Sequence, residues 1–340
     1  MSSSNEGRLL PAIESPYLQE YGWRVERPAP IRALLTVAHF VRAKPLGAFG
    51  ALMLILIIVV GVFSPWIARY SYDQVNLSAA LTGPSSAHWF GTDHNGRDIY
   101  SRLVYGCQIT AMVGLGTVLL VITLALVVGL ISGYFGGRTD FIVQRLNDIW
   151  LSFPAIFLIL TLVAVLTTTS GSGFFGLGRG PEVGPNPQGG PWFWNTFPRT
   201  TIVILALGLV LAGGTSRVIR SAVLATRANP YIEAAEVLGA SHVRIILRHV
   251  LPNIMPTVIV LATLQLGTAI LAEATISFLG VGITNFPTWG QMLSGRTRDL
   301  AENHLYLALF PGFAIFLAVF GFNMLGDALR DVLDPRLRGG

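Results

Sequence analysis

The chain has 340 residues, a formal net charge of +5, and a composition that is 52% hydrophobic and 12% charged. An average soluble domain carries about 25% charged residues, so this composition indicates a membrane protein rather than an ordinary soluble domain. The positive charge is not gathered in a basic patch with interleaved aromatic residues, and we therefore predict no binding to nucleic acid. The single cysteine, Cys107, excludes an internal disulfide bond.

The sequence also excludes one kind of ATP-binding loop. Lys44 is the only lysine, and Pro45 follows it. A Walker A loop needs Gly-Lys-Ser/Thr, because the lysine reaches the terminal phosphates while backbone N–H groups cradle them. If ATP drives this protein, the ATPase is another subunit.

The first 45 residues precede the first hydrophobic span. Residues 1–30 are polar, contain four prolines and lack a hydrophobic run after a basic start, so we expect a cytoplasmic tail rather than a cleaved signal peptide. From Ile31 to Arg42, apolar residues recur at helical spacing and basic residues flank them. This pattern predicts a short amphipathic helix at the membrane interface.

Six segments are long and apolar enough to cross a membrane, so we predict an all-α membrane protein with six transmembrane helices. The first is uncharged for over twenty residues, which at 1.5 Å per residue matches the roughly 30 Å thickness of the hydrocarbon core. Glycines at 129, 133 and 137 predict close helix contact, and Pro154 predicts a kink in the third span. The spans are Leu46–Ile67, Ile109–Gly133, Phe141–Leu166, Thr200–Ser216, Ile254–Phe278 and Leu305–Leu325.

These spans divide the chain into segments with different expected locations. We assign residues 1–45 to the cytoplasmic tail and interfacial helix and 46–68 to the first transmembrane helix. Residues 69–106 form a periplasmic segment, and 107–328 form a five-helix core that includes a cytoplasmic loop at 227–252. Residues 329–340 form a cytoplasmic tail.

Two connecting segments contain residues that suggest a ligand. Asp93 and Asp98, with His88 and His94 nearby, allow a metal site, but their spacing matches no metal signature, and we expect a capped turn leading into the next helix. Residues 167–199 are rich in Gly and Pro and contain Trp192-Phe193-Trp194. Their aromatic residues favour a membrane-interface belt over a ligand platform.

Two polar side chains fall inside the fifth span and are candidates for lining a transport pathway, Gln265 and Glu273. A carboxylate deep in a span costs about 2.5–3.5 kcal/mol on insertion scales, so it normally faces a partner or a wet cavity. Because Glu273 is near the end of its helix, a hydrogen bond to the backbone of the neighbouring loop is at least as good an interpretation.

The distribution of basic residues orients the six spans. The N-terminal segment, the 138–145 loop, the 217–248 loop and the C-terminal tail hold sixteen Lys and Arg residues. Cytoplasmic loops carry an excess of basic residues, so both termini and the 217–248 loop are predicted to be cytoplasmic. The other side holds seven arginines: Arg69, Arg97, Arg102, Arg179, Arg199, Arg296 and Arg298.

The polar stretch at 228–252 is unusual in a chain this apolar. Asn229 is a good N-cap and Pro230 suits the first helical position, while Gly239 can close the helix in the left-handed conformation. Ser241 can cap a second helix, which Pro252 would limit. The sequence therefore predicts a short, rigid, capped helix outside the membrane, followed by a bend.

This stretch resembles the EAA loop of ABC importer permeases. The likeness rests on Glu233-Ala234-Ala235, on Gly239 six positions after the glutamate, and on Leu251-Pro252. Further short motifs resemble those of the C-type subunit of dipeptide/oligopeptide permeases and extend the likeness over about three quarters of the chain. They are Phe90-Gly91-Thr92-Asp93, Gly96-Arg97-Asp98, Ser277-Phe278-Leu279-Gly280, Leu325-Gly326-Asp327 and Leu333-Asp334-Pro335-Arg336.

The resemblance implies the type I (MetI-like) permease fold and a subunit that forms half of the translocation pathway for di- or oligopeptides. It implies a heterodimer with a homologous permease in the bacterial or archaeal inner membrane, two ATP-binding subunits that hold ATP and Mg, an extracytoplasmic substrate-binding protein, and membrane lipid. No cofactor, metal or enzymatic activity is expected in this chain. The residues implied to couple it to an ATPase subunit are Glu233, Ala234, Ala235, Leu238, Gly239 and Pro252.

Other cargoes and other classes of protein stay open as alternatives. Permeases of the same family with nearly the same motifs carry nickel chelates, glutathione or oligosaccharides. A proton-coupled secondary transporter would show intramembrane carboxylate or histidine relays and inverted repeats, whereas this chain offers Glu273 and no clear repeat. A membrane hydrolase would need a nucleophile–base pair or metal ligands, and the six scattered histidines and single cysteine offer no such set.

Overall fold

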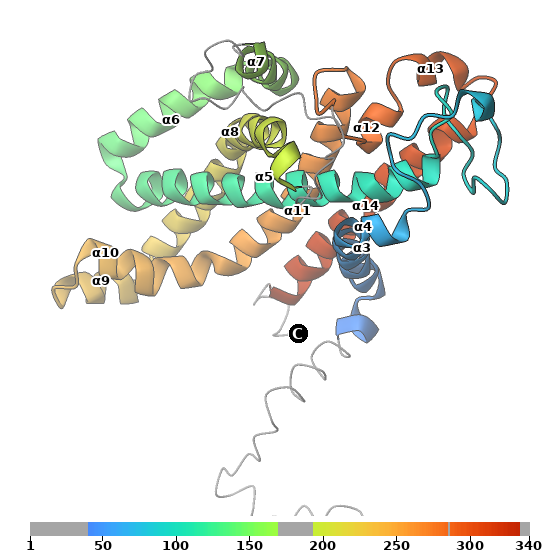
Figure 1. Cartoon of the computed structure of the whole chain (residues 1–340). Coiled ribbons are helices and arrows are strands. Elements are labelled where there is room, and N and C mark those ends of the chain that lie inside the picture. Colours follow the sequence, from blue (N-terminus) through green and yellow to red (C-terminus); the bar gives the residue numbers. More distant parts are fainter. Residues whose placement is uncertain (1–39, 169–192, 285, 334–340) are drawn as a thin grey trace, which may run out of the picture. The chain divides into compact units, whose positions relative to one another are not determined.

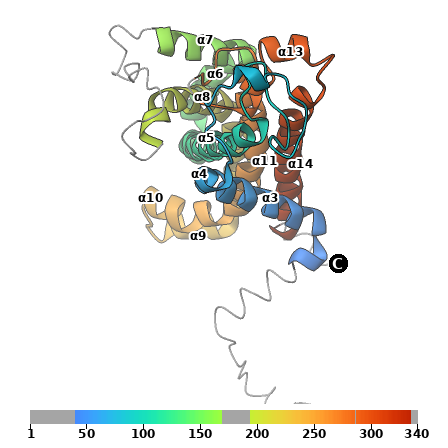
Figure 2. The ribbon, with the colours of Figure 1, turned by 45° about the vertical axis from the view of Figure 1, so that its right-hand side comes forward.

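The computed structural model of the protein describes residues 40–168, 193–284 and 286–333. The chain divides into two units, Met1–Pro45 and Leu46–Gly340, and the account below concerns the second. The predicted N-terminal tail, most of the predicted amphipathic helix and most of the Gly- and Pro-rich loop lie outside the described residues. The described residues of the second unit form helices and connecting segments without a β-strand (Figures 1 and 2).

The helices vary in length from a single turn to about ten turns. In chain order they are α3 (Pro45–Val62), α4 (Ser64–Ile67), η1 (Leu77–Ala79), α5 (Ile99–Phe135), α6 (Gly137–Ser152), α7 (Ala155–Thr168), α8 (Phe193–Arg227), α9 (Pro230–Val237), α10 (His242–Ile245), the π-helical turn η2 (Ile246–Val250), α11 (Leu251–Phe278), α12 (Trp289–Met292), α13 (Arg296–Leu300) and α14 (Tyr306–Leu333).

Five of these elements are long and apolar enough to cross a membrane: α3, α5, the Arg199–Arg227 part of α8, the continuous stretch His242–Phe278, and α14. The pair α6 and α7 is a sixth if it counts as one span, although its two helices meet at an angle of 85°. The prediction of an all-α membrane protein is confirmed.

Several helices extend beyond the predicted spans. The second span was predicted from Ile109, but α5 begins at Ile99, where the Asp98 carboxylate accepts a bond from the Ser101 N–H at 2.8 Å. The fourth and sixth predicted spans ended at Ser216 and Leu325, whereas α8 continues to Arg227 and α14 to Leu333. Hydropathy marks where the apolar residues end, and a helix with a polar turn can continue past that point.

The third predicted span is broken rather than gently kinked. Helix α6 ends at Ser152, Phe153 is extended, and Pro154 precedes α7. Proline disfavours helical conformation in the residue before it and cannot donate a backbone hydrogen bond, which accounts for the break. In α6, which precedes the break, the Asn147 amide donates to the Gly213 carbonyl at 3.0 Å and Asp140 pairs with Arg220. These contacts hold α6 against α8.

Helices α5 and α8 pack closely against each other through glycines of α5. A Cβ atom added to Gly129 would meet the Ile219 side chain at 2.8 Å, and one added to Gly133 would meet Val223 at 2.9 Å. The predicted close contact through these two glycines is confirmed. Gly137 takes no part in it, because it begins α6 with a φ of +52° and has open space around its Cβ position.

Replacing Gly129 and Gly133 together by alanine is expected to lower the free energy of unfolding by about 1–3 kcal/mol, because the added methyl groups force the two helices apart. The measurement is denaturation of the purified protein in mixed micelles. Gly312→Ala in α14 is the control, since a Cβ there meets nothing within 4 Å, and its change should stay within about 0.5 kcal/mol. Equal stability of the two variants would contradict the close crossing.

Candidate functional site: the loop between α8 and α11

The loop that joins α8 to α11 contains a short helix with a well-formed end. Helix α9 closes at Gly239, whose φ is +79°. The Gly239 N–H bonds to the Glu236 carbonyl at 2.9 Å, and the Ala240 N–H bonds to the Ala235 carbonyl at 3.1 Å. This pair of bonds is a Schellman motif, which requires the left-handed residue that glycine supplies at least cost. The predicted closure of the helix at Gly239 is confirmed.

The start of α9 differs from the prediction. Asn229 occupies the N-cap position with extended backbone, but its side chain makes no capping bond to α9. Instead its amide donates to the carbonyls of Ala225 and Thr226, at 3.2 and 2.8 Å. Asn229 therefore closes the end of α8, because those last carbonyls have no partner within their own helix.

The segment after α9 also differs from the prediction. Ser241 caps the next helix as expected, accepting a bond from the Arg244 N–H at 3.4 Å. Pro252, however, does not limit that helix, which runs unbroken from His242 to Phe278 over 37 residues. The π-helical turn Ile246–Val250 comes directly before Pro252. A π turn inserts one extra residue and so changes which carbonyls face the proline, which lets the helix continue.

The loop is fixed to the helices by two isoleucines. Ile232 of α9 is 1% exposed and Ile245 of α10 is fully buried. Both lie in one apolar cluster with side chains from α5, α8 and α11, so the loop shares its core with three long helices. The other buried members of this cluster are Ala125, Tyr134, Ile219, Val223, Val250, Ile254 and Val258.

Two polar contacts add to this anchoring. The Tyr134 hydroxyl at the end of α5 lies 3.0 Å from Nδ1 of His242. The Asn253 amide of α11 donates to the Tyr231 hydroxyl of α9 at 3.1 Å. Hydrogen bonds of this kind fix the orientation of the helices more than they add to stability. The first bond joins α10 to the end of α5, and the second joins α9 to α11.

The outer surface of α9 combines a carboxylate with apolar side chains. Val237 and Leu238 are 83% and 87% exposed, far more than is usual for aliphatic side chains on a soluble surface. Glu233 and Ala234 are exposed beside them, while Ala235 packs on the apolar cluster. Gly239 and Pro252 are also exposed.

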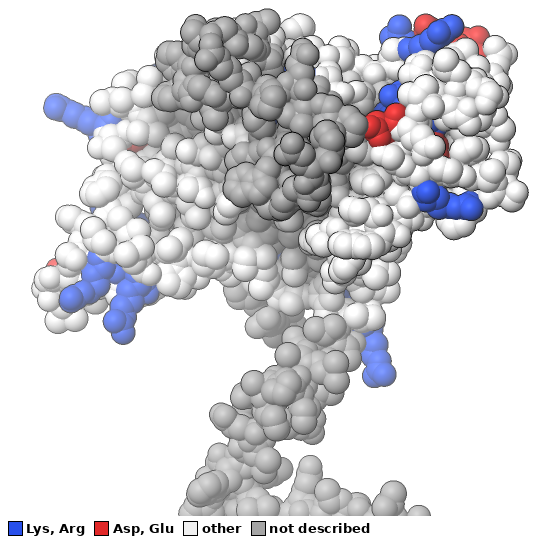
Figure 3. Space-filling model, in the orientation of Figure 1, with Lys and Arg blue, Asp and Glu red and all other residues white. Residues whose placement is uncertain are grey.

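Sequence reasoning missed some of the residues that define this site. Val237, Val243 and Leu247 are also exposed and apolar. The anchors Ile232 and Ile245 were missed as well. The sequence contains Ile232 before Gly239 and Ile245 after it, but neighbouring apolar residues such as Ile246 look the same in the sequence, and burial is decided by helices that are distant along the chain. Figure 3 shows basic side chains at the end of the molecule that carries α9 and α10, and a second charged group around α13.

The two candidate pathway residues lie inside the chain. The Gln265 amide of α11 donates to the Thr215 hydroxyl of α8, and its carbonyl oxygen is buried without a partner among the described residues. Glu273 is 2% exposed and hydrogen-bonds to the hydroxyls of Ser277 and Thr288. The Thr288 bond joins the start of α12 to α11, so Glu273 does bond to the neighbouring loop, but through a side chain rather than through the backbone that the sequence interpretation named.

Residues 91–98 form the capped turn that the sequence predicts. The Asp93 carboxylate accepts bonds from the N–H groups of Asn95 and Arg97, at 2.8 and 3.0 Å. Asp98 caps α5 and lies 2.9 Å from Nδ1 of His88. Both carboxylates are thus occupied by backbone and side-chain donors, and the described residues contain no cluster that could hold a metal ion.

Comparison with known proteins agrees with this arrangement. Residues 125–339 match the family described as binding-protein-dependent transport system inner membrane component, and residues 38–84 match the N-terminal transmembrane domain of oligopeptide transport permease C. The chain therefore belongs to the family of binding-protein-dependent transport system inner membrane components, the permeases of ABC importers. Within that family it is a C-type permease subunit.

Individual relatives cover most of the chain. A dipeptide transport system permease protein of Alkalihalophilus pseudofirmus is 37% identical over 298 residues, 87% of this chain and 88% of its own length. A glutathione transport system permease protein of Escherichia coli is 36% identical, with 88% and 89% covered. An oligopeptide transport system permease protein of Bacillus subtilis is 34% identical, with 87% and 88% covered.

Truncation of Ile232 should loosen α9 without touching its outer surface. Ile232→Ala is expected to lower the local stability of α9 by about 2–3 kcal/mol, because it leaves a cavity in the shared cluster. Hydrogen exchange of the α9 amides measures this as faster exchange. Leu238→Ala is the matched control, since that side chain is 87% exposed and should leave the exchange unchanged. Equal exchange rates in the two variants would show that Ile232 does not anchor the loop.

Proposed function

We propose that the α9 loop couples this permease to an ATP-binding subunit. The observation that carries the proposal is a short helix fixed to α5, α8 and α11 on one face and exposing Glu233, Val237 and Leu238 on the other. An exposed apolar group of this size on a polar loop suits a protein partner. Glu233 gives that contact a charge-assisted bond, and Ala234 allows close approach.

We further propose that the energy for transport arrives mechanically. ATP and Mg are held by two partner subunits, which close on each other when ATP binds. Their closure pulls on α9, and the continuous helix His242–Phe278 carries the movement across the membrane. A rigid connection is required because a flexible loop would absorb the movement.

The proposed arrangement places the α9 loop and both termini in the cytoplasm. The excess of basic residues on that side supports this orientation. A homologous permease completes the pathway, and an extracytoplasmic substrate-binding protein delivers the cargo, as the family description implies for a binding-protein-dependent system.

Di- and oligopeptides are the proposed cargo. The names of two relatives that match along most of the chain support this, one a dipeptide and one an oligopeptide permease. A third is named for glutathione, itself a peptide. Nickel chelates and oligosaccharides are the remaining alternatives within the same class of importer.

The variants Glu233→Lys and Gly239→Leu should uncouple ATP hydrolysis from uptake. Lysine cannot make the charge-assisted contact, and leucine at the Gly239 position costs about 1–2 kcal/mol in the left-handed conformation. We expect uptake into proteoliposomes to fall about 10-fold or more while the assembled complex still hydrolyses ATP. Glu302→Lys, in the exposed turn before α14, and Gly239→Asn are the controls. Normal uptake by the first two variants would mean that the loop is not the coupling element.

The cargo can be tested with the assembled transporter and its binding protein. We expect saturable, ATP-dependent uptake of a labelled dipeptide, because the proposed pathway accepts a peptide backbone with free termini. An excess of unlabelled peptide should abolish this uptake, and an excess of a nickel chelate or an oligosaccharide should not. Uptake of either of those compounds in place of the peptide would reassign the cargo and leave the coupling role intact.

A further inference from the structure

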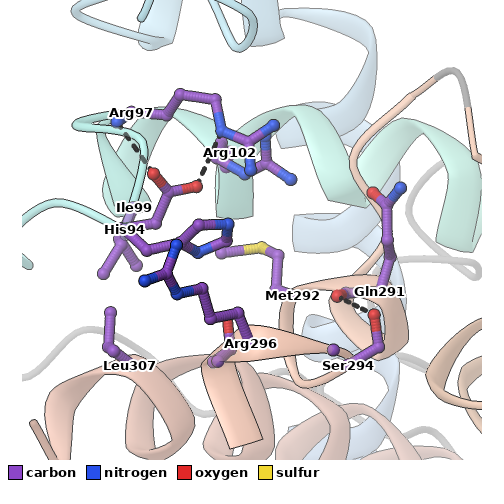
Figure 4. A pocket seen from close by; sticks show the side chains of 12 residues that line it. His94, Arg97, Ile99, Arg102, Gln291, Met292, Ser294, Arg296 and Leu307 are labelled. Carbon is purple, nitrogen blue, oxygen red and sulfur yellow. Dashed lines mark hydrogen bonds and ion pairs between the residues drawn. The ribbon is translucent and has the colours of Figure 1, made fainter. Parts of the chain in front are cut away.

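A small cavity lies at the end of α5 that is distant from the α9 loop. It has a volume of about 230 Å³ and is enclosed by the turn before α5, the first turn of α5, and the segment around α12 and α13 (Figure 4). Its lining residues are Asp93, His94, Arg97, Ile99, Arg102, Gln291, Met292, Ser294, Gly295, Arg296, Thr297 and Leu307.

The charge of this cavity is strongly positive. Three guanidinium groups line it, those of Arg97, Arg102 and Arg296, against the single carboxylate of Asp93. The Asp93 carboxylate already accepts three hydrogen bonds, two from backbone N–H groups and one from Nε of Arg97 at 2.7 Å. The other two guanidinium groups have no acidic partner among the described residues.

Arg102 is the buried one of these three arginines, and most of its donors are unused. The residue is 6% exposed, and the one hydrogen bond of its side chain among the described residues is to the Tyr72 carbonyl at 3.3 Å. A guanidinium has five N–H donors, so most of those on Arg102 are left for whatever enters the cavity. Buried charges are normally paired. The cavity therefore has a built-in requirement for an anion.

His94 adds a neutral polar group to the same wall. Its Nδ1 atom is buried without a hydrogen-bond partner among the described residues. Burial lowers the pKa of the His94 imidazole below its ordinary value of 6.5; Asp93 raises it, and Arg97, Arg296 and Arg102 lower it. The environment thus favours the neutral imidazole, which adds no further positive charge to that of the arginines. In Figure 4 it lies among the arginine side chains.

We infer that this cavity receives the carboxylate of an aspartate or glutamate side chain from the extracytoplasmic substrate-binding protein. Planar guanidinium groups bind carboxylates through paired, charge-assisted bonds. Arg296 is exposed and Arg102 is buried, so a protruding side chain meets first one and then the other. The apolar residues Ile99, Met292 and Leu307 reduce the local dielectric and strengthen the attraction.

Two features of the cavity, its share of the outer basic residues and its position, favour a protein side chain as the ligand. Only seven of the 23 basic residues belong to the predicted outer side, yet three of these seven surround this one cavity. The cavity is also formed by connecting segments and helix ends, where a docking protein makes contact, and its volume suits one side chain better than an oligopeptide. This inference rests on the proposed function, since it uses the predicted orientation and a binding protein.

The test uses the full transporter in nanodiscs with the binding protein that stimulates its ATP hydrolysis. The measured quantity is the binding-protein concentration that gives half-maximal stimulation. Arg296→Glu is expected to raise this concentration about 10-fold or more, because it replaces attraction by repulsion at the cavity mouth. Arg298→Glu, on the same short helix but outside the cavity, should change it less than about twofold. Raising the salt concentration should weaken docking to the unmodified transporter. The binding-protein concentrations that half-maximally stimulate the unmodified transporter and Arg296→Glu should then lie closer together.

A neutralisation series identifies the partner residue. Each acidic residue on the docking face of the binding protein is changed to its amide; for one of them the change should weaken docking to the unmodified transporter about 10-fold or more but leave docking to Arg296→Glu unchanged or improved, because the two changes act on the same contact. Arg102→Gln, checked for normal assembly, should weaken docking in the same direction. If it does not assemble, Arg296→Glu alone decides.

The outcomes separate this inference from the proposed function. If the unmodified transporter is stimulated but Arg296→Glu behaves like Arg298→Glu, or no neutralised acidic residue loses its effect in the presence of Arg296→Glu, the inference is overturned and the proposed function stands. If docking is normal and only the half-saturating concentration of cargo rises, the cavity acts on the cargo and the inference is equally overturned. If no binding protein stimulates the unmodified transporter, the proposed function and the inference both fail.

Discussion

The burial of Ile232 and Ile245 in a cluster shared with α5, α8 and α11 is the constraint on which the functional reading depends. A loop of polar residues between two hydrophobic helices would otherwise be free to move by itself. Because these two side chains are removed from water together with residues of three long helices, the loop can move only if those helices move with it. The bond of Asn253 to Tyr231 then fixes the orientation of α9, and the bond of Tyr134 to His242 holds α10 against α5.

Much of the architecture follows from the sequence, because hydropathy and helix-ending residues act locally. The hydrophobic spans, the break at Pro154 and the closure of α9 at Gly239 depend on a few neighbouring residues each. The ends of the long helices do not. Helix α5 begins at Ile99, where Asp98 caps it, ten residues before the apolar run that marks the span, and α8 continues past its apolar run through Arg217 and Arg220, which pair with Asp148 and Asp140 of α6.

The site divides in the same way. The residues that form the exposed surface of α9 are consecutive, so their pattern is visible in the sequence. The unbroken helix through Pro252 depends on a π turn that no local pattern indicated. The convergence of Arg97, Arg102 and Arg296 joins residues almost 200 positions apart, and their shared cavity exists only once the chain is folded. Long-range contacts of this kind are beyond periodicity and spacing.

The length of the helix His242–Phe278 gives the loop considerable leverage. At 1.5 Å per residue, 37 residues make a rod of about 55 Å. A rod of that length displaces its far end by about 1 Å for each degree through which it turns about the near end. A small rotation imposed beside His242 is therefore enough to shift Glu273, and the segment fastened to it, by a distance comparable to the width of a peptide. A slight rotation at one end of this helix therefore becomes a wide displacement at the other.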